Sequence, residues 1–144
     1  MTQVRDILQT KGSHVWSIGP GATALQGAKL MTEHRIGSLV VLEQGRVAGM
    51  FTERDLLRLV SDGRDPSQTP VGEAMTAEVV CCAPTTPLEE AKSAMKNRRV
   101  RHLPVLGDDE NLLGVISIGD LNAHETADHQ QTIFLMSEYI YGRV

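Results

Sequence analysis

Aromatic residues are scarce in this 144-residue chain, where they make up 3% of the total and include one tryptophan. The core must therefore be aliphatic, built from Val, Ile, Leu, Met and Ala. The cysteines are the adjacent pair Cys81 and Cys82, and neighbouring cysteines almost never bridge each other in a fold. We therefore expect no disulfide framework and a reducing, cytoplasmic location.

Long apolar runs and a strong excess of positive charge are also missing. No run approaches the ~20 residues that a membrane helix needs, and the first residues lack the apolar region of a signal peptide. We therefore expect neither a membrane segment nor a leader. The net charge of −4 argues against general nucleic-acid binding, which uses basic surfaces.

The common catalytic motifs are missing as well. The chain has no G-x-x-x-x-G-K-[ST] loop to cradle phosphate and no G-x-S-x-G nucleophile elbow. Its five histidines show no H-E-x-x-H spacing, and its cysteines show no C-x-x-C spacing. We therefore expect no catalytic residues and no metal site, and we expect that the protein is not an enzyme.

What the chain does contain is an internal repeat. When the sequence is shifted by 64 residues, and by 65 after residues 107–110, ten of 38 compared positions are identical. Unrelated segments would share about two or three at ordinary residue usage. The identities include Gly49 with Gly114 and Asp55 with Asp120.

Each repeat has the same predicted elements, because helical periodicity and short apolar runs around polar turns follow one another in the same order. Strands are expected at residues 15–18, 38–42 and 47–51, and again at 79–82, 103–106 and 112–116. Helices are expected at residues 25–34, 53–60, 88–95 and 118–124. The predicted fold class is α/β (α+β type), with two βαββα repeats packed in pseudo-twofold symmetry.

The chain divides into four predicted segments. Residues 1–62 hold an N-terminal helix and the first repeat, 63–74 form a linker, 75–127 hold the second repeat, and 128–144 form a C-terminal helix. The linker is predicted because its sequence is polar and contains Pro and Gly. Both terminal helices present apolar faces, which could pack onto the body or form a dimer contact. We expect a homodimer of four repeats.

A G-h-h-[ST]-x-x-D motif, in which h is a hydrophobic residue, closes the hairpin of each repeat. Thr52 and Ser117 stand where a strand ends and a helix begins, so that each hydroxyl can cap its helix. Asp55 and Asp120 follow three residues later, where a carboxylate can accept hydrogen bonds from a vicinal diol such as that of ribose. A plain S/T-x-x-D cap is the alternative, and it is common.

These two motifs in register resemble the cystathionine β-synthase (CBS) domain, paired as in a Bateman module. Residues 36–40, 71–76 and 101–105 add to the resemblance, which covers about residues 4–142. It implies an adenosyl ligand whose adenine lies between apolar strand residues of one repeat and whose ribose meets the Asp of the other. One implied pocket joins Thr52 and Asp55 to Val80, Val100 and Arg101, and the other joins Ser117 and Asp120 to Trp16, Ile36 and Gly37.

Some residues of these pockets have two interpretations. Trp16 departs from the family's pattern, and it could stack on a base or crowd the pocket. Arg99 and Arg101 are interpreted as phosphate contacts because a guanidinium donates bidentately, although charges at a helix end are also typical of a solvated surface. His102 is a candidate ligand contact, for which a partly buried structural role is the favoured interpretation.

The expected function is that of a regulatory energy- or redox-state sensor. It would bind an adenosyl nucleotide (AMP, ATP or NAD(H)) between the repeats and signal by a conformational shift to an unknown partner protein. No obligatory cofactor is expected. The alternatives are a dimerisation or scaffold module whose pockets bind nothing, and a nucleic-acid-binding module that uses residues 98–102.

Overall fold

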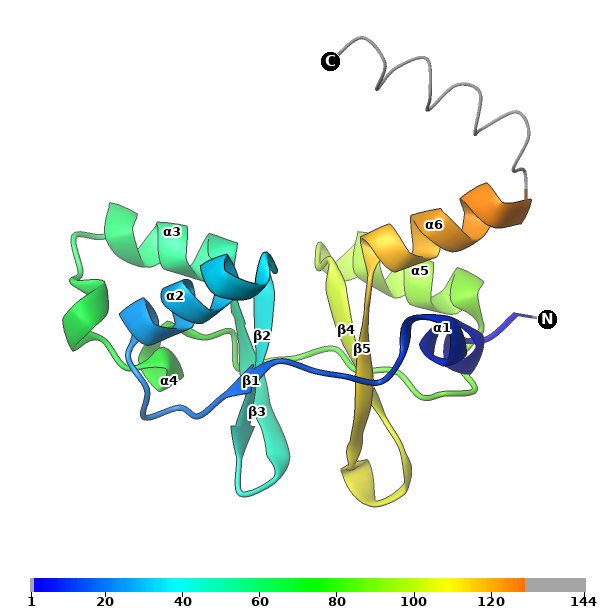
Figure 1. Cartoon of the computed structure of the whole chain (residues 1–144), viewed down its shortest axis with the longest axis horizontal. Helices are drawn as coiled ribbons and strands as arrows, with labels where there is room; N and C mark the ends of the chain where they lie inside the picture. Colours follow the sequence, from blue (N-terminus) through cyan, green and yellow to red (C-terminus); the bar gives the residue numbers. More distant parts are fainter. Residues whose placement is uncertain (1, 129–144) are drawn as a thin grey trace, which may run out of the picture.

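Figure 1 shows the computed structural model of the chain, which describes residues 2–128 as two similar halves. The first half contains β1 (Ser17–Ile18), α2 (Ala24–His34), β2 (Ser38–Glu43), β3 (Arg46–Thr52) and α3 (Glu53–Ser61). The second contains α5 (Leu88–Arg98), β4 (His102–Leu106), β5 (Leu112–Ser117) and α6 (Ile118–Asp128), with a 3-10 turn η2 (Asp108–Glu110) in its hairpin. The mixed α/β fold of two repeats is confirmed.

Three further elements lie outside these halves in sequence. They are α1 (Val4–Lys11), the 3-10 turn η1 (Pro66–Gln68) and α4 (Val71–Ala74). The predicted C-terminal helix lies outside the described residues. Within residues 2–128, no helix combines the length and the apolarity that crossing a membrane requires.

The two hairpins match in register. Strand β2 pairs antiparallel with β3, and β4 with β5, so that Val41 lies opposite Gly49 and Val105 lies opposite Gly114. A register shift follows directly after each of these pairs. In the first half β1 adds a parallel strand, which gives the order β1-β2-β3.

The strand predicted at residues 79–82 is wrong. This segment makes one isolated parallel bridge, in which the Cys82 amide donates to the Pro104 carbonyl at 3.0 Å and the Leu106 amide donates to the Cys82 carbonyl at 2.9 Å. The next bond of a parallel ladder would run from the amide of residue 104 to the carbonyl of Val80. Proline has no amide N–H, whereas Val40 at the equivalent place donates to the Trp16 carbonyl at 3.2 Å.

Each half is completed by a short helix that precedes the other half in sequence. The second core contains Val4 and Ile7 of α1, packed with residues such as Met95 and Leu103. The first core contains Val71 of α4, packed with residues such as Phe51. Helix α1, which the sequence analysis grouped with the first repeat, therefore packs into the second, and the end of the predicted linker is part of the first core.

Equivalent backbone hydrogen bonds dock these two helices. The Val4 amide donates to the Thr86 carbonyl at 2.9 Å, and the Val71 amide donates to the Ala22 carbonyl at 2.7 Å. Val4 and Val71 are both fully buried. Because the same bonds recur 64 to 67 residues apart, the exchange of the lead-in helices is part of the repeat itself.

The two motif glycines make room for the exchanged segments. A Cβ at Gly49 would lie 2.6 Å from the Thr76 carbonyl oxygen and 2.7 Å from Met75 Sδ. A Cβ at Gly114 would lie 2.8 Å from a methyl carbon of Leu8. The close neighbour that a glycine within a strand implies is therefore another part of the chain.

We predict that Gly49→Ala destabilises the protein by about 1–3 kcal/mol, because the added methyl group overpacks against backbone that cannot rotate away. Gly19→Ala is the matched control, since nothing lies within 4 Å of a Cβ at that position. Urea unfolding of both variants measures the difference. Equal stability of the two variants would contradict the packing account.

Candidate functional site

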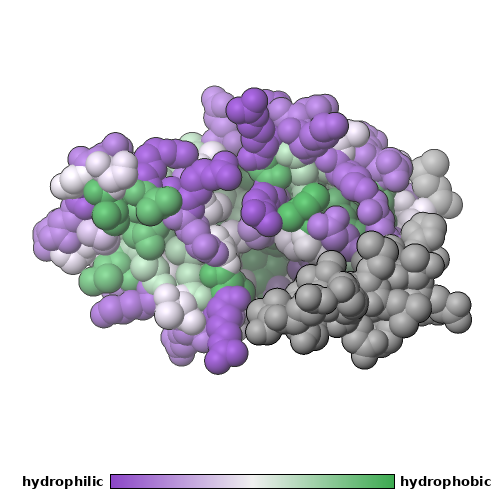
Figure 2. Space-filling view, turned by 90° about the horizontal axis from the view of Figure 1, so that it is seen from above, coloured by the Kyte–Doolittle hydropathy of each residue, from purple (hydrophilic) through white to green (hydrophobic). Residues whose placement is uncertain are grey.

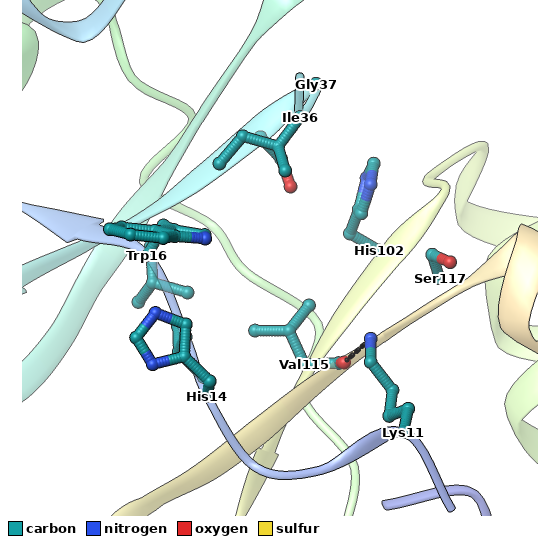
Figure 3. A pocket seen from close by; sticks show the side chains of 11 residues that line it. Lys11, His14, Trp16, Ile36, Gly37, His102, Val115 and Ser117 are labelled. Atoms are coloured by element: carbon teal, nitrogen blue, oxygen red, sulfur yellow. Dashed lines mark hydrogen bonds between the residues drawn. The ribbon is translucent and has the colours of Figure 1, made fainter. Parts of the chain in front are cut away.

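A cavity of about 290 Å³ lies between the two halves (Figure 3). Its walls come from the segment before β1, the start of β2, strands β4 and β5, and the end of α1. The lining residues are Lys11, His14, Val15, Trp16, Ile36, Gly37, Ser38, Val40, His102, Val115 and Ser117. The structure thus brings together five residues of the predicted site: Trp16, Ile36, Gly37, His102 and Ser117.

Trp16 forms the most distinctive part of the wall. Its indole stacks on the imidazole of His34, with ring centroids 3.4 Å apart and planes 16° apart, and the edge of His14 meets it at 4.5 Å. The side chain remains 37% exposed. His34 therefore covers one face of the indole, and the edge of His14 also lies against the ring, at the wall of the cavity.

Ser117 and Asp120 form a polar corner beside the cavity. The Ser117 amide donates to Asp120 Oδ2 at 2.8 Å, and the Asp120 amide donates to Ser117 Oγ at 3.1 Å. These reciprocal bonds are a capping box at the start of α6. The Asp120 side chain is still 22% exposed; it is not itself a lining residue, but it is bonded to Ser117 and Lys11, which both line the cavity.

Thr52 and Asp55 make the same box at the start of α3, but Asp55 is buried, with a side chain only 2% exposed. Its Oδ2 accepts from the Thr52 amide at 3.0 Å and the Thr52 hydroxyl at 3.1 Å. Its Oδ1 accepts from the Thr76 hydroxyl at 3.0 Å and lies 3.6 Å from the Arg58 guanidinium. Most of the acceptor capacity of this carboxylate is used within the protein.

The other predicted site residues lie elsewhere. Val80 and Val100 pack against the second core. Arg99 directly follows α5 and has the left-handed conformation, with φ of 55°. Both Arg99 and Arg101 are exposed. Neither arginine lines the cavity of Figure 3. Their interpretation as phosphate contacts stays a prediction.

Lys11 is a lining residue that sequence reasoning missed. Its ammonium donates to Asp120 Oδ2 at 2.7 Å and to the Val115 carbonyl at 2.8 Å. Nothing local to residue 11 indicates this contact, since its partner lies 109 residues away. A signal exists in the repeat: a shift of 67 aligns Val4 and Leu8 with Val71 and Met75, which marks the exchanged helix.

His102 is partly buried at the start of β4 and lines the cavity. Burial lowers its pKa below the ordinary 6.5, and the positive charges of Arg101 and Lys11 lower this pKa further, against the opposing effects of Asp120 and Glu53. The imidazole is therefore neutral at pH 7. It can accept or donate a hydrogen bond but contributes no charge to hold an anion.

The two thiols and the possible metal ligands are also candidates for functional groups. Burial raises the pKa of the Cys82 thiol to about 12, and burial also raises the pKa of Cys81. Both thiols are therefore protonated at neutral pH and poor nucleophiles. In the part of the chain that is described, no group of three His, Cys, Asp or Glu side chains could hold a metal ion.

The repeated fold and the cavity between its halves define a tandem-repeat module, and comparison with known proteins gives its family. The family model for the CBS domain matches residues 4–62 and 71–125. The chain belongs to the CBS domain family, as a tandem pair. The CBS domain-containing protein YhcV of Bacillus subtilis is 38% identical over 129 residues, which cover 89% of each chain.

Solved structures agree with this assignment. A putative signal-transduction protein with CBS domains from Burkholderia ambifaria is 39% identical, with a TM-score of 0.84 over 88% of this chain and 96% of that one. A CBS domain protein from Pyrobaculum aerophilum, solved in complex with AMP, is 24% identical, with a TM-score of 0.75 over 83% of this chain and 89% of that one.

The lowered pKa of His102 predicts a loss of stability in acid. An unfolded histidine titrates near 6.5, so below this pH the unfolded chain binds the proton first and stability falls, until the pH has passed through the lower folded pKa. The slope is at most ~1.4 kcal/mol per pH unit. We expect the free energy of unfolding to drop less between pH 7.5 and 5.5 in His102→Gln than in wild type.

Urea unfolding at the two pH values measures this drop. A drop in His102→Gln as large as in wild type would mean that His102 does not cause the acid sensitivity.

Proposed function

We propose that this protein is a regulatory module that binds one adenosyl nucleotide per chain in the cavity between its halves. The observation that carries the proposal is the cavity together with the partly exposed Asp120 carboxylate, which is bonded to two of its lining residues. Apolar side chains of Ile36 and Val115 line the space for a flat ring. The carboxylate beside Ser117 is a suitable acceptor for the two hydroxyl groups of a ribose.

The size of the cavity favours a mononucleotide. About 290 Å³ is near the lower end of the ~300–1,000 Å³ of typical ligand pockets. AMP is therefore the first candidate, ahead of ATP and of the larger NAD. The Pyrobaculum aerophilum protein was solved with AMP, but at 24% identity that likeness supports the fold alone; the choice of an adenosyl ligand rests on membership of the CBS family, and the cavity supports a ligand of this size.

We propose a single site, although the repeat suggests two. A ribose at the first motif would have to replace bonds that Asp55 makes to Thr52 and Thr76, and it would have to reach a carboxylate that is almost fully buried. Asp120 is more exposed than Asp55, and the ammonium and the amide that bond to its carboxylate both donate to the same one of its two oxygens. The first motif therefore serves the fold and the second serves the ligand.

Regulation follows from where the ligand would lie. A ligand that touches Trp16 and Ile36 on one half and Val115 and Ser117 on the other stabilises one relative orientation of the halves. A partner protein that binds this orientation better would sense the nucleotide. We keep the cytoplasm as the proposed compartment, in line with the two free thiols.

We predict that Asp120→Asn weakens AMP binding about tenfold or more, since one or two charge-assisted hydrogen bonds are lost. Asp55→Asn should instead leave the affinity for AMP nearly unchanged and lower the free energy of unfolding by about 1–3 kcal/mol, because its bonds are internal. Isothermal titration calorimetry and urea unfolding measure the two effects.

The two aspartates act as controls for each other, because the substitution is the same at equivalent positions. An unchanged affinity for AMP in Asp120→Asn would contradict the assignment of Asp120 to the ribose. A binding loss in Asp55→Asn as large as that in Asp120→Asn would show that the first motif also binds ligand. Wild-type protein that binds no adenosyl nucleotide would favour the scaffold function.

We also propose a homodimer through the face that α3 presents. Leu57 is 70% exposed and Val60 is 53% exposed on that helix, and Figure 2 shows hydrophobic side chains over the helices of the first half. Such a patch on a small soluble protein marks an interaction site. Twofold dimers are the commonest oligomers.

The dimer predicts a mass of twice 15.7 kDa by light scattering. The double variant Leu57→Glu with Val60→Glu should reduce this to the mass of one chain, since charges would be buried at the contact. Asn97→Asp, at an exposed position of α5, should remain dimeric. A monomeric wild type, or a dimeric double variant, would contradict this interface.

A further inference from the structure

Lys11 is held where the ligand's ribose would bind. It is the last residue of α1, and its ammonium bonds to both Asp120 Oδ2 and the Val115 carbonyl. Figure 3 shows it facing the cavity beside Ser117 and across from Trp16. The ion pair is partly shielded, with side chains 35% and 22% exposed, so it is stronger than a fully solvated pair.

The ammonium and a ribose would compete for the same acceptor. Asp120 Oδ2 already accepts from the Ser117 amide in addition to Lys11. The two hydroxyl groups of a ribose need the acceptor capacity of this carboxylate. A ribose hydroxyl that bonds to Oδ2 takes the place of Lys11, and it replaces a charge-assisted bond with a neutral donor.

A phosphate can offset that loss. Lys11 is the one lysine or arginine among the residues that line this cavity, and Arg99 and Arg101 are exposed outside it. A lysine carries three donors on a flexible four-carbon stem. Once released from Asp120, its ammonium can pair with an anion in the same cavity without any movement of the backbone.

We propose that Lys11 is an internal counterion of Asp120 that the ribose of a nucleotide displaces and that the nucleotide's phosphate then takes up. This rests on the proposed function, and it adds a specificity rule to it. The cavity selects phosphorylated nucleosides because a nucleoside without phosphate leaves the displaced ammonium without an anionic partner. Ligand binding also releases the end of α1, next to Gly12 and the chain that leads to Trp16.

The test compares adenosine with AMP by calorimetry. We expect Lys11→Met, which keeps the apolar stem, to bind adenosine up to about tenfold more tightly than wild type, the scale of one charge-assisted hydrogen bond, and AMP with little change, so that the preference for AMP shrinks by that factor. Lys29→Met removes the same charge from an exposed position of α2 and should change neither affinity. Lys11→Arg should keep the preference for AMP.

The wild-type chain offers a second test that needs no variant. Salt screens partly exposed ion pairs, so raising the NaCl concentration should strengthen the binding of adenosine, which only breaks an ion pair, more than that of AMP, which exchanges one ion pair for another. The same salt response for both ligands, or an unchanged preference for AMP in Lys11→Met, overturns the role of Lys11 alone. Wild-type protein that binds neither ligand overturns the proposed function and this inference with it.

Discussion

The exchange of two short helices between the repeats is the interaction on which the rest of the structure depends. Neither half has a complete core of its own, because α1 fills the second core and α4 fills the first. Gly49 and Gly114 have no side chain, and this leaves room for the segments that these helices carry. The two halves are thereby joined to each other, and the cavity lies between them.

The same exchange gives the aspartates of two equivalent motifs different surroundings. The segment after α4 brings the Thr76 hydroxyl onto Asp55, whose carboxylate becomes a buried structural group. The end of α1 brings the Lys11 ammonium onto Asp120, whose carboxylate stays partly exposed at the edge of a cavity. A hydroxyl bonded inside the fold is a permanent partner, whereas a lysine on a flexible stem is an exchangeable one.

Much of the fold could be predicted from the sequence, because local patterns determine it. Helical periodicity predicted α2 and α5, and the polar turns predicted both hairpins. The repeat then predicted the elements of the second half from those of the first. The cavity wall of Trp16, Ile36, Gly37 and Ser117 followed from the family resemblance. The prediction of a strand at 79–82 was wrong because Pro104, on the partner strand, has no amide N–H to donate. The difference between the two aspartates could not be predicted, since Asp120 meets a partner 109 residues away.

The central claim, that one ligand binds at the second motif and not at the first, is tested most directly by NMR. Amide chemical shifts of the labelled protein would be followed during a titration with AMP. The account predicts saturable changes at Gly12, Gly37 and residues 115–120, with Thr52, Asp55 and Thr76 unmoved. Changes centred on Thr52 and Asp55, or no change at any residue, would contradict it.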